Sequence, residues 1–487
     1  MTFSPSLTTL SATPAAEAVT LSPATGVRPD PGRGCTVVIE TMGCKLNLAD
    51  SEVLARDFSR LGFEVIEPPP GTAEGMLVAP APVDVYILNT CTVTHVADRK
   101  ARQQLRNARR RFPNAYVVAT GCYPARASAE VAALPEVDLV TGNDSKPELA
   151  ERVVRELIAR THVPHVPTRT GIPPHRTRAF VKIQEGCNDY CSYCIIPKTR
   201  GSSRSFPPQQ ILAELRQRER EGYREVVLTG TQLGDYGIPR PGSRRIGPDQ
   251  RDQATEGNPL ARLIALILQE TGIPRIRLSS IQPQDVTEPL LALWWDPRLC
   301  PHFHLPLQSG SNAVLRRMRR RYTAGEFLAA ASRIRAAVAG VSITTDIIAG
   351  FPGETEEDFE HTMDLAQRAS FADIHVFPYS PRAGTLGTRL DRRVPDLVKQ
   401  ERARRLLALA QRARTAHRSR FIGATRPVLW EEQKNGVWTG LTDNYLRVYS
   451  PSLHTYAGLI EPLPLTPTAF APPHLVPPTS YHAAYAP

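Results

Sequence analysis

The sequence has no apolar run long enough to cross a membrane. A spanning helix needs about 20 consecutive, mostly apolar residues, whereas charged or turn-forming residues interrupt every apolar stretch here well before that length. The first residues also lack the basic and apolar segments of a secretory signal peptide. We therefore expect a cytoplasmic protein that has no membrane partner.

Cysteine is scarce, with 8 residues in a chain of 487. Thiols stay reduced in the cytoplasm, where clustered cysteines bind metal more often than they form disulfides. Three of the eight, Cys187, Cys191 and Cys194, nevertheless lie close together in "EGCNDYCSYCIIPKTRG". Such concentration in a cysteine-poor chain indicates a metal site.

Acidic residues are fewer than basic ones, 48 against 59, which leaves a formal net charge of +11. An excess of positive charge favours a polyanionic partner, most simply a nucleic acid. Two segments concentrate basic residues that we expect to contact phosphates. They are Arg99, Lys100, Arg102, Arg106, Arg109, Arg110 and Arg111, and then Arg316, Arg317, Arg319, Arg320 and Arg321. A solvated helix face explains either segment alone equally well.

The length of the chain exceeds what one hydrophobic core can serve, so several domains are expected. Residues 1–33 are rich in Ser, Thr, Ala and Pro and predict a disordered tail. Residues 34–150 alternate short apolar strands with helical patterns, which predicts an α/β domain with a parallel sheet. Residues 173–412 repeat strand and helix six times, which predicts a partial (β/α)6 barrel with its function at the C-terminal ends of the strands.

In residues 421–487 apolar and polar residues alternate, which predicts a small all-β domain with a loose C-terminus. Its exposed aromatic and basic side chains could stack on or contact nucleotide bases. The candidates are Trp430, Trp438, Tyr445 and Arg447, although packing in a small barrel explains Trp430 at least as well. In the barrel segment, His302 and His304 alternate on one predicted strand, and we favour buried core histidines over catalytic ones.

The C-x3-C-x2-C spacing of Cys187, Cys191 and Cys194 follows a predicted strand directly. Three thiolates at this spacing can hold three irons of a [4Fe-4S] cube and leave the fourth iron open to a small molecule. A zinc site would need a fourth ligand from elsewhere in the chain. Three buried or zinc-binding cysteines remain the alternative interpretation.

Three further cysteines, Cys44, Cys91 and Cys122, lie far apart in the sequence, but each follows a predicted strand of the N-terminal sheet. Parallel strands deliver their C-terminal ends to one edge, so these thiols can converge. Gly43 and Gly121 precede two of them and would relieve crowding. Small buried apolar residues remain the alternative for all three cysteines.

Cys187, Cys191, Tyr193 and Cys194 resemble the C-x3-C-x-aromatic-C signature of radical S-adenosylmethionine (SAM) enzymes. This resemblance implies that the open iron binds SAM and that one electron cleaves it to a 5′-deoxyadenosyl radical. Two later segments resemble SAM-contacting segments of that superfamily. They are Gly230, Thr231 and Gln232, near the methionine amino group, and Gly350 and Gly353, near the adenine.

Between residues 35 and 390 the chain resembles the methylthiotransferase family, through "TMGCKLNLADSE", "LNTCTVT", "VATGCYP", "HFHLPLQSGS" and "TTDIIAGFPGE". The resemblance implies that Cys44, Cys91 and Cys122 hold a second [4Fe-4S] cluster with its own open iron. It also implies two uses of SAM, for methylation of a cluster-bound sulfur and for the radical, with flavodoxin or ferredoxin as electron donor. The C-terminal segment resembles the RNA-binding TRAM domain. Cys35 and Cys300 match no motif, and we assign them a structural role.

Within that family, "GCKLN", "KIQEGC" and "HVFPYSPRAGT" resemble the threonylcarbamoyladenosine branch, although Gln282 stands where an acidic residue is usual. The implied function is addition of a methylthio group at carbon 2 of threonylcarbamoyladenosine beside the anticodon of a tRNA. The alternatives are the same chemistry on isopentenyladenosine or on a ribosomal-protein aspartate. A noncatalytic iron-sulfur RNA-binding protein is the alternative from another class.

Overall fold

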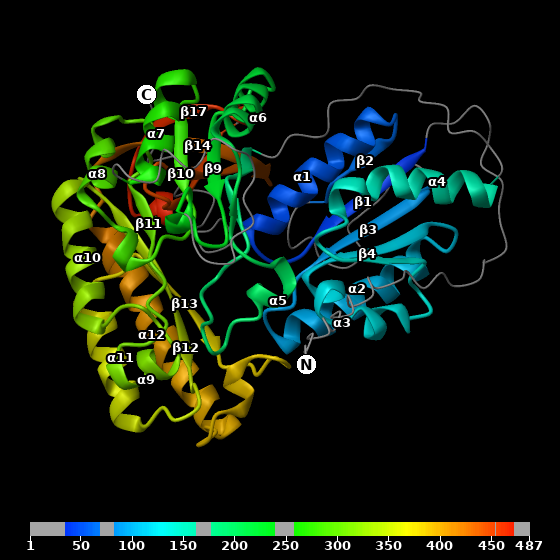
Figure 1. Cartoon of the computed structure of the whole chain (residues 1–487). Coiled ribbons are helices and arrows are strands. Elements are labelled where there is room, and N and C mark those ends of the chain that lie inside the picture. The colour runs from blue at the N-terminus through cyan, green and yellow to red at the C-terminus, as the bar shows by residue number, and fades with distance from the viewer. Residues whose placement is uncertain (1–34, 69–81, 162–176, 239–257, 453, 472–487) are drawn as a thin grey trace, which may run out of the picture.

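A computed structural model describes residues 35–68, 82–161, 177–238, 258–452 and 454–471 (Figure 1). The predicted N-terminal tail and the loose end of the C-terminal segment lie outside these ranges. Within them, every helix is too short or too polar to span a lipid bilayer.

The N-terminal domain is a five-stranded parallel sheet of order β2-β1-β3-β4-β5. The strands are β1 Thr36–Thr41, β2 Glu64–Ile66, β3 Val85–Thr90, β4 Tyr116–Gly121 and β5 Leu139–Thr141. Helices α1 (Lys45–Arg60) and α4 (Leu149–Thr161) bury apolar residues against one face, and α2 (His95–Arg111) and α3 (Cys122–Ala132) cover the other. The predicted parallel α/β domain is confirmed, and β2 and β5 are strands that the sequence pattern did not reveal.

The central domain has six parallel strands in two sheets, of order β10-β9-β6 and β11-β12-β13. The strands are β6 Arg178–Lys182, β9 Glu225–Thr229, β10 Arg275–Leu278, β11 His302–His304, β12 Ser342–Ala349 and β13 Asp373–Pro378. Isolated bridges from Ile276 to Leu299 and from Ser280 to His304 join the sheets. In the described part of the chain β6 and β13 do not pair with each other, so the predicted partial barrel is confirmed.

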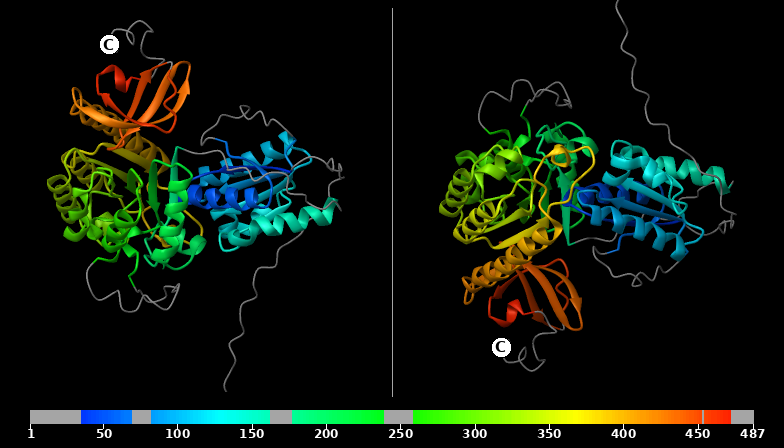
Figure 2. Two further views of the ribbon diagram at one scale, coloured as in Figure 1. Left: turned by 90° about the horizontal axis from the view of Figure 1, so that it is seen from above. Right: turned by 90° about the horizontal axis from the view of Figure 1, so that it is seen from below.

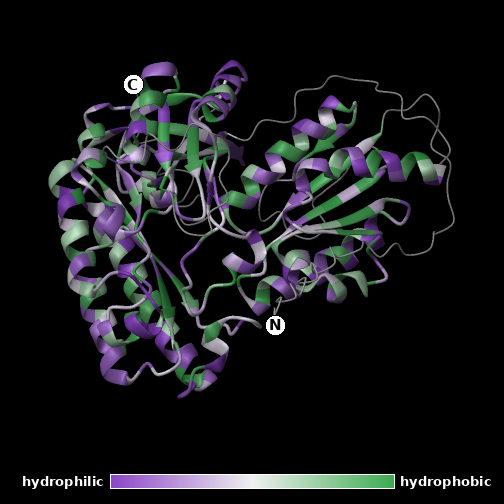
Figure 3. Ribbon diagram, in the orientation of Figure 1, coloured by the Kyte–Doolittle hydropathy of each residue, from purple (hydrophilic) through white to green (hydrophobic). Residues whose placement is uncertain are grey.

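Helices cover the outer face of this barrel. They are α6 Pro208–Arg220, α7 Pro259–Glu270, α10 Ala324–Ala337, α11 Glu356–Arg368 and α12 Asp396–Ser419. Alternate strand residues such as Ile343 and Ile347 of β12 pack outward into one apolar core with these helices. Figure 3 shows the resulting pattern of mostly apolar strands and amphipathic helices. The intervening residues Thr344 and Asp346 therefore face the barrel interior, which is polar.

The C-terminal domain is a four-stranded antiparallel sheet of order β16-β15-β14-β17. Its strands are β14 Thr425–Lys434, β15 Val437–Thr442, β16 Arg447–Pro451 and β17 Ile460–Pro464. Figure 2 shows it against the barrel, apart from the N-terminal domain. Trp430 and Trp438 are buried in its apolar core. The packing alternative is therefore confirmed for Trp430, and stacking on bases is wrong for Trp438, because both rings fill the core of their own domain.

Candidate active site between two cysteine triads

The loop after β6 folds Cys187, Cys191 and Cys194 into one cluster. The Cys187 N–H donates to the Gly201 carbonyl at 3.1 Å, and the Cys194 N–H donates to the Cys191 carbonyl at 2.9 Å. Burial raises the pKa of Cys187 and of Cys194 to about 12; the charge of Cys191 adds to the rise at Cys194, and the charges of Asp189, Cys194 and Cys191 add to it at Cys187. Isolated thiols in this place would stay protonated, so binding of a cation is what would make them thiolates.

Arg320 lies against this cluster and follows helix α9 (Asn312–Arg317). Its Nη1 donates to the Cys191 sulfur at 3.3 Å, and its Nη2 donates to Gln282 Oε1 at 3.0 Å. Gln282, the residue that departs from the branch motif, thus orients this guanidinium. A positive charge at this distance stabilises a sulfur that carries negative charge. The run of arginines predicted that Arg320 contacts phosphate, whereas its side chain turns toward Cys191.

Several other basic residues also have partners within the chain. Arg321 pairs with Asp189 at 3.1 Å, and Arg109 contacts Asp138. Arg317 donates to the carbonyl of Pro352 at 3.0 Å, and Arg102 pairs with Glu130 at 2.9 Å. The prediction of phosphate contacts is wrong for Arg320, because its guanidinium binds the loop that carries Cys191. Arg102 and Arg109 are engaged in ion pairs within the chain. The exposed members of the two segments are Arg99, Lys100, Arg106, Arg110, Arg111, Arg316, Arg319 and Arg321.

The second triad lies at one edge of the N-terminal sheet. Cys44 precedes α1, Cys91 follows β3 and Cys122 begins α3, directly after β4. Burial raises the pKa of Cys91 to about 12, and the charges of Cys44 and Cys122 add to that rise. The expected convergence of three thiols on one sheet edge is therefore present.

The two glycines beside this triad are required by space as well as by backbone angle. Gly43 has φ +104°, and an added Cβ would lie 2.6 Å from the Cys91 Cβ. Gly121 has φ +102°, and an added Cβ would lie 2.6 Å from the Thr90 carbonyl oxygen. Any side chain at either position would push the sulfur atoms of the triad apart or strain the backbone.

Helix α5 (Ile196–Arg200) joins the two triads, since it follows Cys194 directly and packs against α3. Asn143 donates to the Cys122 sulfur at 3.5 Å and to the Thr199 carbonyl at 2.7 Å. Burial acts to lower the pKa of Arg200, but the charges of Asp50, Cys122 and others outweigh burial and raise it. The segment that carries the first triad therefore also forms part of the wall of the second.

Arg200 belongs to a buried ionic network that fixes the N-terminal domain on the barrel. Asp50 of α1 pairs with Lys146 at 2.8 Å, with Lys182 of β6 at 2.7 Å and with Arg200 at 3.1 Å. Glu185 pairs with Arg200 at 2.6 Å. Because each charge is partnered, the ion pairs offset the large desolvation cost of burying these groups, and the network sets the relative position of both triads.

The first segment predicted to contact SAM follows β9. The Gln232 N–H donates to Gln184 Oε1 at 2.9 Å, and its side chain donates to Asp285 at 2.9 Å. The Thr231 hydroxyl is buried and has no hydrogen-bond partner among the described residues. An added Cβ on Gly230 would lie 3.0 Å from Gln184 Oε1, which explains the glycine. A polar ligand would satisfy the Thr231 hydroxyl.

Gly350 and Gly353, the second such segment, both have positive φ, +75° and +86°. An added Cβ would lie 2.1 Å from Lys399 Cγ at the first and 2.5 Å from Arg317 Nε at the second. Side chains of the protein itself, from Lys399 and Arg317, therefore occupy the space that these two glycines leave open. Contact of this turn with an adenine stays a prediction.

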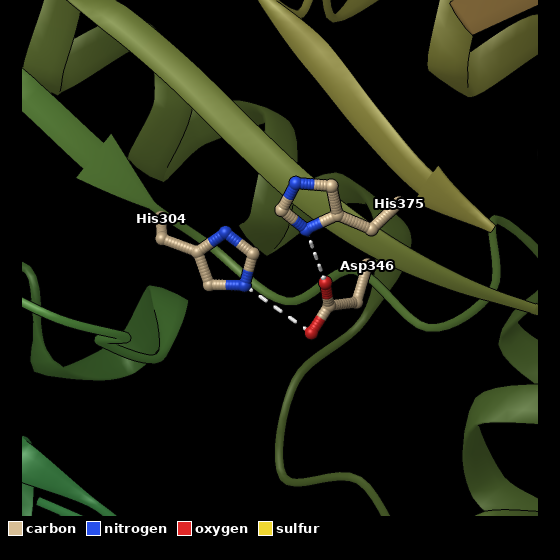
Figure 4. A group of neighbouring side chains, drawn as sticks. All are labelled: His304, Asp346 and His375. Carbon is tan, nitrogen blue, oxygen red and sulfur yellow. Dashed lines mark hydrogen bonds and ion pairs between the residues drawn. The ribbon is translucent and has the colours of Figure 1, made fainter. Parts of the chain in front are cut away.

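Sequence reasoning did not group His304, Asp346 and His375, which the structure brings together from β11, β12 and β13 (Figure 4). The sequence did contain a signal for this grouping. The segments "HFH", "TTD" and "DIH" each end on one of these three residues and place it on the interior face of one of three adjacent strands. His302, two residues before His304, is buried and neutral, since burial holds its pKa well below the ordinary value. The prediction of a core histidine is confirmed for His302.

The side chains present fit the groups that the motifs imply. Three cysteines at each site, which act electrostatically on one another, are a donor set for an iron-sulfur cluster with one open iron. The unpartnered Thr231 hydroxyl offers one contact for a polar ligand such as SAM beside the first site.

Comparisons with known proteins agree with these features. Residues 181–366 match the Radical SAM superfamily, and residues 36–142 match the "Uncharacterized protein family UPF0004". The threonylcarbamoyladenosine tRNA methylthiotransferase MtaB of Bacillus subtilis (strain 168) is 35% identical over 430 residues, which are 85% of this chain and 90% of the relative. The tRNA-2-methylthio-N(6)-dimethylallyladenosine synthase of Carboxydothermus hydrogenoformans is 36% identical over 387 residues, 76% of this chain and 82% of the relative.

Among solved structures, the radical SAM methyltransferase TsrM of Kitasatospora setae, solved with cobalamin and a [4Fe-4S] cluster, has a TM-score of 0.50. The alignment covers 92% of each chain at 13% sequence identity. At this identity the likeness concerns the fold alone.

Proposed function

We propose, for a chain that belongs to the radical SAM tRNA methylthiotransferase family, that the substrate is threonylcarbamoyladenosine beside the anticodon and that carbon 2 receives the methylthio group. The observation that carries the proposal is the joining of the two cysteine triads through α5. A reaction that needs a radical and a sulfur donor on one substrate atom requires both sites to border one space.

Cys187, Cys191 and Cys194 would hold a [4Fe-4S] cluster that binds SAM, and Cys44, Cys91 and Cys122 would hold a second one. When bound, these groups supply the 5′-deoxyadenosyl radical and the methylthio sulfur. An external reductant of the flavodoxin or ferredoxin class would deliver the electrons.

Residues of this chain would balance the charge of the two sites and hold them in position. Arg320 offsets negative charge on Cys191, while Arg200 does the same beside Cys44 and Cys122. The Asp50 network ties the N-terminal domain to the barrel and so fixes the separation of the two triads. Fixed geometry favours transfer of a substrate radical to the sulfur over its escape to solvent.

The tRNA would bind through charge and shape. The exposed basic side chains of α2, chiefly Arg99, Lys100, Arg110 and Arg111, offer phosphate contacts on the N-terminal domain. The C-terminal sheet, which resembles a TRAM domain, lies beside the barrel and would add backbone contacts. Binding of this type weakens steeply as salt concentration rises.

Mass spectrometry of tRNA nucleosides from a deletion strain tests the substrate. We expect the methylthio form of threonylcarbamoyladenosine to disappear and its precursor without sulfur to accumulate. Unchanged methylthio-threonylcarbamoyladenosine, with loss of the isopentenyl counterpart instead, would overturn the choice of substrate while leaving the chemistry intact.

A further inference from the structure

The interior of the barrel contains an organised polar group that the reaction described above does not use. Asp346 accepts hydrogen bonds through both oxygens, from His304 Nε2 at 3.2 Å and from His375 Nδ1 at 3.0 Å (Figure 4). The two imidazoles lie nearly parallel, with ring centroids 5.4 Å apart. The carboxylate thus orients both rings.

Both ring nitrogens of His304 have partners. Its Nε2 pairs with Asp346, and its Nδ1 lies 2.9 Å from the Thr344 hydroxyl. That hydroxyl in turn accepts from Nε2 of the neutral His302, at 3.2 Å. His304 is therefore held by partners on both sides and has no group to offer a ligand.

His375 differs from His304 because its side chain is 51% exposed, whereas that of His304 is 9% exposed. Its Nδ1 is used by Asp346, so Nε2 is the nitrogen left for a ligand. The hydrogen bond that His375 donates to Asp346 raises the pKa of His375, which favours a protonated ring with Nε2–H as a donor. The groups that act on His375 are Asp346 and Asp373, which raise its pKa, and Lys45, which lowers it.

Two histidines and a carboxylate can bind a transition metal, but this group is poorly suited to one. Both Asp346 oxygens already accept from imidazole N–H groups, and a metal would have to displace both protons. Lys45 also acts electrostatically on Asp346 and on His375. The positive charges of Arg277 and Arg178 act on Lys45 more strongly than the carboxylates of Glu225 and Asp346, and this excess of positive charge disfavours a cation and favours an anion.

Lys45 is the residue that follows Cys44, at the start of α1. Its ammonium lies 5.9 Å from the ring centroid of Tyr445, and among the described residues Glu225 and Asp346 act on it electrostatically without forming an ion pair with it. Burial costs an ammonium free energy that only an anionic or polar partner restores. The covalent link to Cys44 places the backbone of Lys45 beside the second triad, and its side chain extends from there to the ring of Tyr445.

We propose that Lys45 Nζ and His375 Nε2, the latter oriented by Asp346, bind the carboxylate of the threonylcarbamoyl substituent and so select this nucleoside over an isopentenyl one. The inference rests on the proposed function. A base whose carbon 2 faces the triad of Cys44 brings its N6 substituent within the surroundings of Lys45. An uncharged isopentenyl group would leave the Lys45 ammonium desolvated and unpaired.

Binding of synthetic anticodon stem-loops to the holoenzyme tests the subsite without turnover. Three loops are compared: one with threonylcarbamoyladenosine, one in which its carboxylate is a primary amide, and one with isopentenyladenosine. A charge-assisted contact predicts that the wild type binds the carboxylate loop at least about tenfold more tightly than the amide loop.

The variants Lys45→Met and His375→Asn isolate the two contacts. Asn keeps a donor for Asp346 but has no group at the place of Nε2. Each variant should weaken binding of the carboxylate loop about tenfold and leave the amide loop unchanged, with iron content equal to that of the wild type. Lys45→Arg, which keeps the charge, should retain the preference for the carboxylate.

The outcomes separate the two proposals. If the wild type methylthiolates threonylcarbamoyladenosine but both variants keep the wild-type ratio of carboxylate to amide affinity, the subsite is wrong and the proposed function stands. If the wild type modifies the isopentenyl loop alone and binds carboxylate and amide loops equally, both proposals fail.

Discussion

The ring of Tyr445 stacks on the imidazole of His302, with centroids 4.4 Å apart and planes inclined by 18°. Tyr445 lies in the turn between β15 and β16, and His302 begins β11, so the contact joins the C-terminal sheet to the barrel. The guanidinium of Arg277 lies 4.8 Å from the same ring centroid and donates to the Asp443 carbonyl at 3.0 Å. The expectation that Tyr445 stacks on nucleotide bases is therefore wrong, because protein groups occupy its ring.

Tyr445→Ala should lower the free energy of unfolding by about 1–3 kcal/mol, because it removes a packed ring from the interface. Thermal unfolding monitored by circular dichroism measures the change. Tyr445→Phe keeps the ring and should stay close to the wild type. An unfolding curve for Tyr445→Ala that superimposes on the wild-type curve would show that this contact does not hold the domain in place.

Gly43→Ala should remove the iron of the second triad, since its Cβ would lie 2.6 Å from the Cys91 Cβ at φ +104°. We expect iron after anaerobic reconstitution to fall from about eight to about four atoms per chain. Gly222→Ala is the matched control, because Gly222 also has positive φ, +85°, but its added Cβ meets nothing within 4 Å. Full iron content in Gly43→Ala would contradict the crowding argument.

Arg320→Met should slow SAM cleavage about tenfold or more, because it removes the hydrogen bond to the Cys191 sulfur. Loss of the positive charge should also shift the reduction potential of the cluster to a more negative value, a readout that a purely structural role would not change. Arg320→Lys should restore part of the potential. Arg316→Met, an exposed neighbour on α9, should match the wild type in both measurements.

The buried His417 should make the protein less stable in acid. It is buried on α12, its Nε2 lies 2.7 Å from the Ser342 hydroxyl, and burial lowers its pKa from 6.5 to about 4. The unfolded chain therefore binds the proton that the folded chain refuses, and stability falls as pH drops from 6.5 toward 4. The full effect is about 3 kcal/mol at most.

His417→Gln should flatten this part of the stability profile, because glutamine does not titrate. The measurement is the difference in unfolding midpoint between pH 7.5 and pH 5 for each protein. Equal differences in the wild type and the variant would show that His417 does not contribute to the acid sensitivity.

The sequence was sufficient for the parts of the fold that local patterns encode. Strand periodicity placed the six barrel strands, and the order of strand and helix predicted the parallel sheet that brings Cys44, Cys91 and Cys122 to one edge. Short edge strands such as β2 and β5, with three residues each, carry too little periodicity to be recognised.

Contacts between distant segments could not be predicted in the same way. Arg320 sits in a run of arginines whose composition indicates phosphate binding, and only the fold shows that its side chain turns toward Cys191. The grouping of His304, Asp346 and His375 depends on the register of three strands separated by long helical connections. Residue type left packing and base stacking open for Trp430 and gave no sign that Trp438 packs inward.

The central claim is that the two cysteine triads serve different steps of one reaction. The most direct measurement quantifies 5′-deoxyadenosine and methylthio nucleoside from threonylcarbamoyladenosine-containing tRNA, under anaerobic reducing conditions, in two triple variants. Replacing Cys187, Cys191 and Cys194 by Ala should abolish both products. Replacing Cys44, Cys91 and Cys122 by Ala should retain 5′-deoxyadenosine and abolish the methylthio nucleoside. Equal loss of 5′-deoxyadenosine in both folded variants would contradict the division of roles.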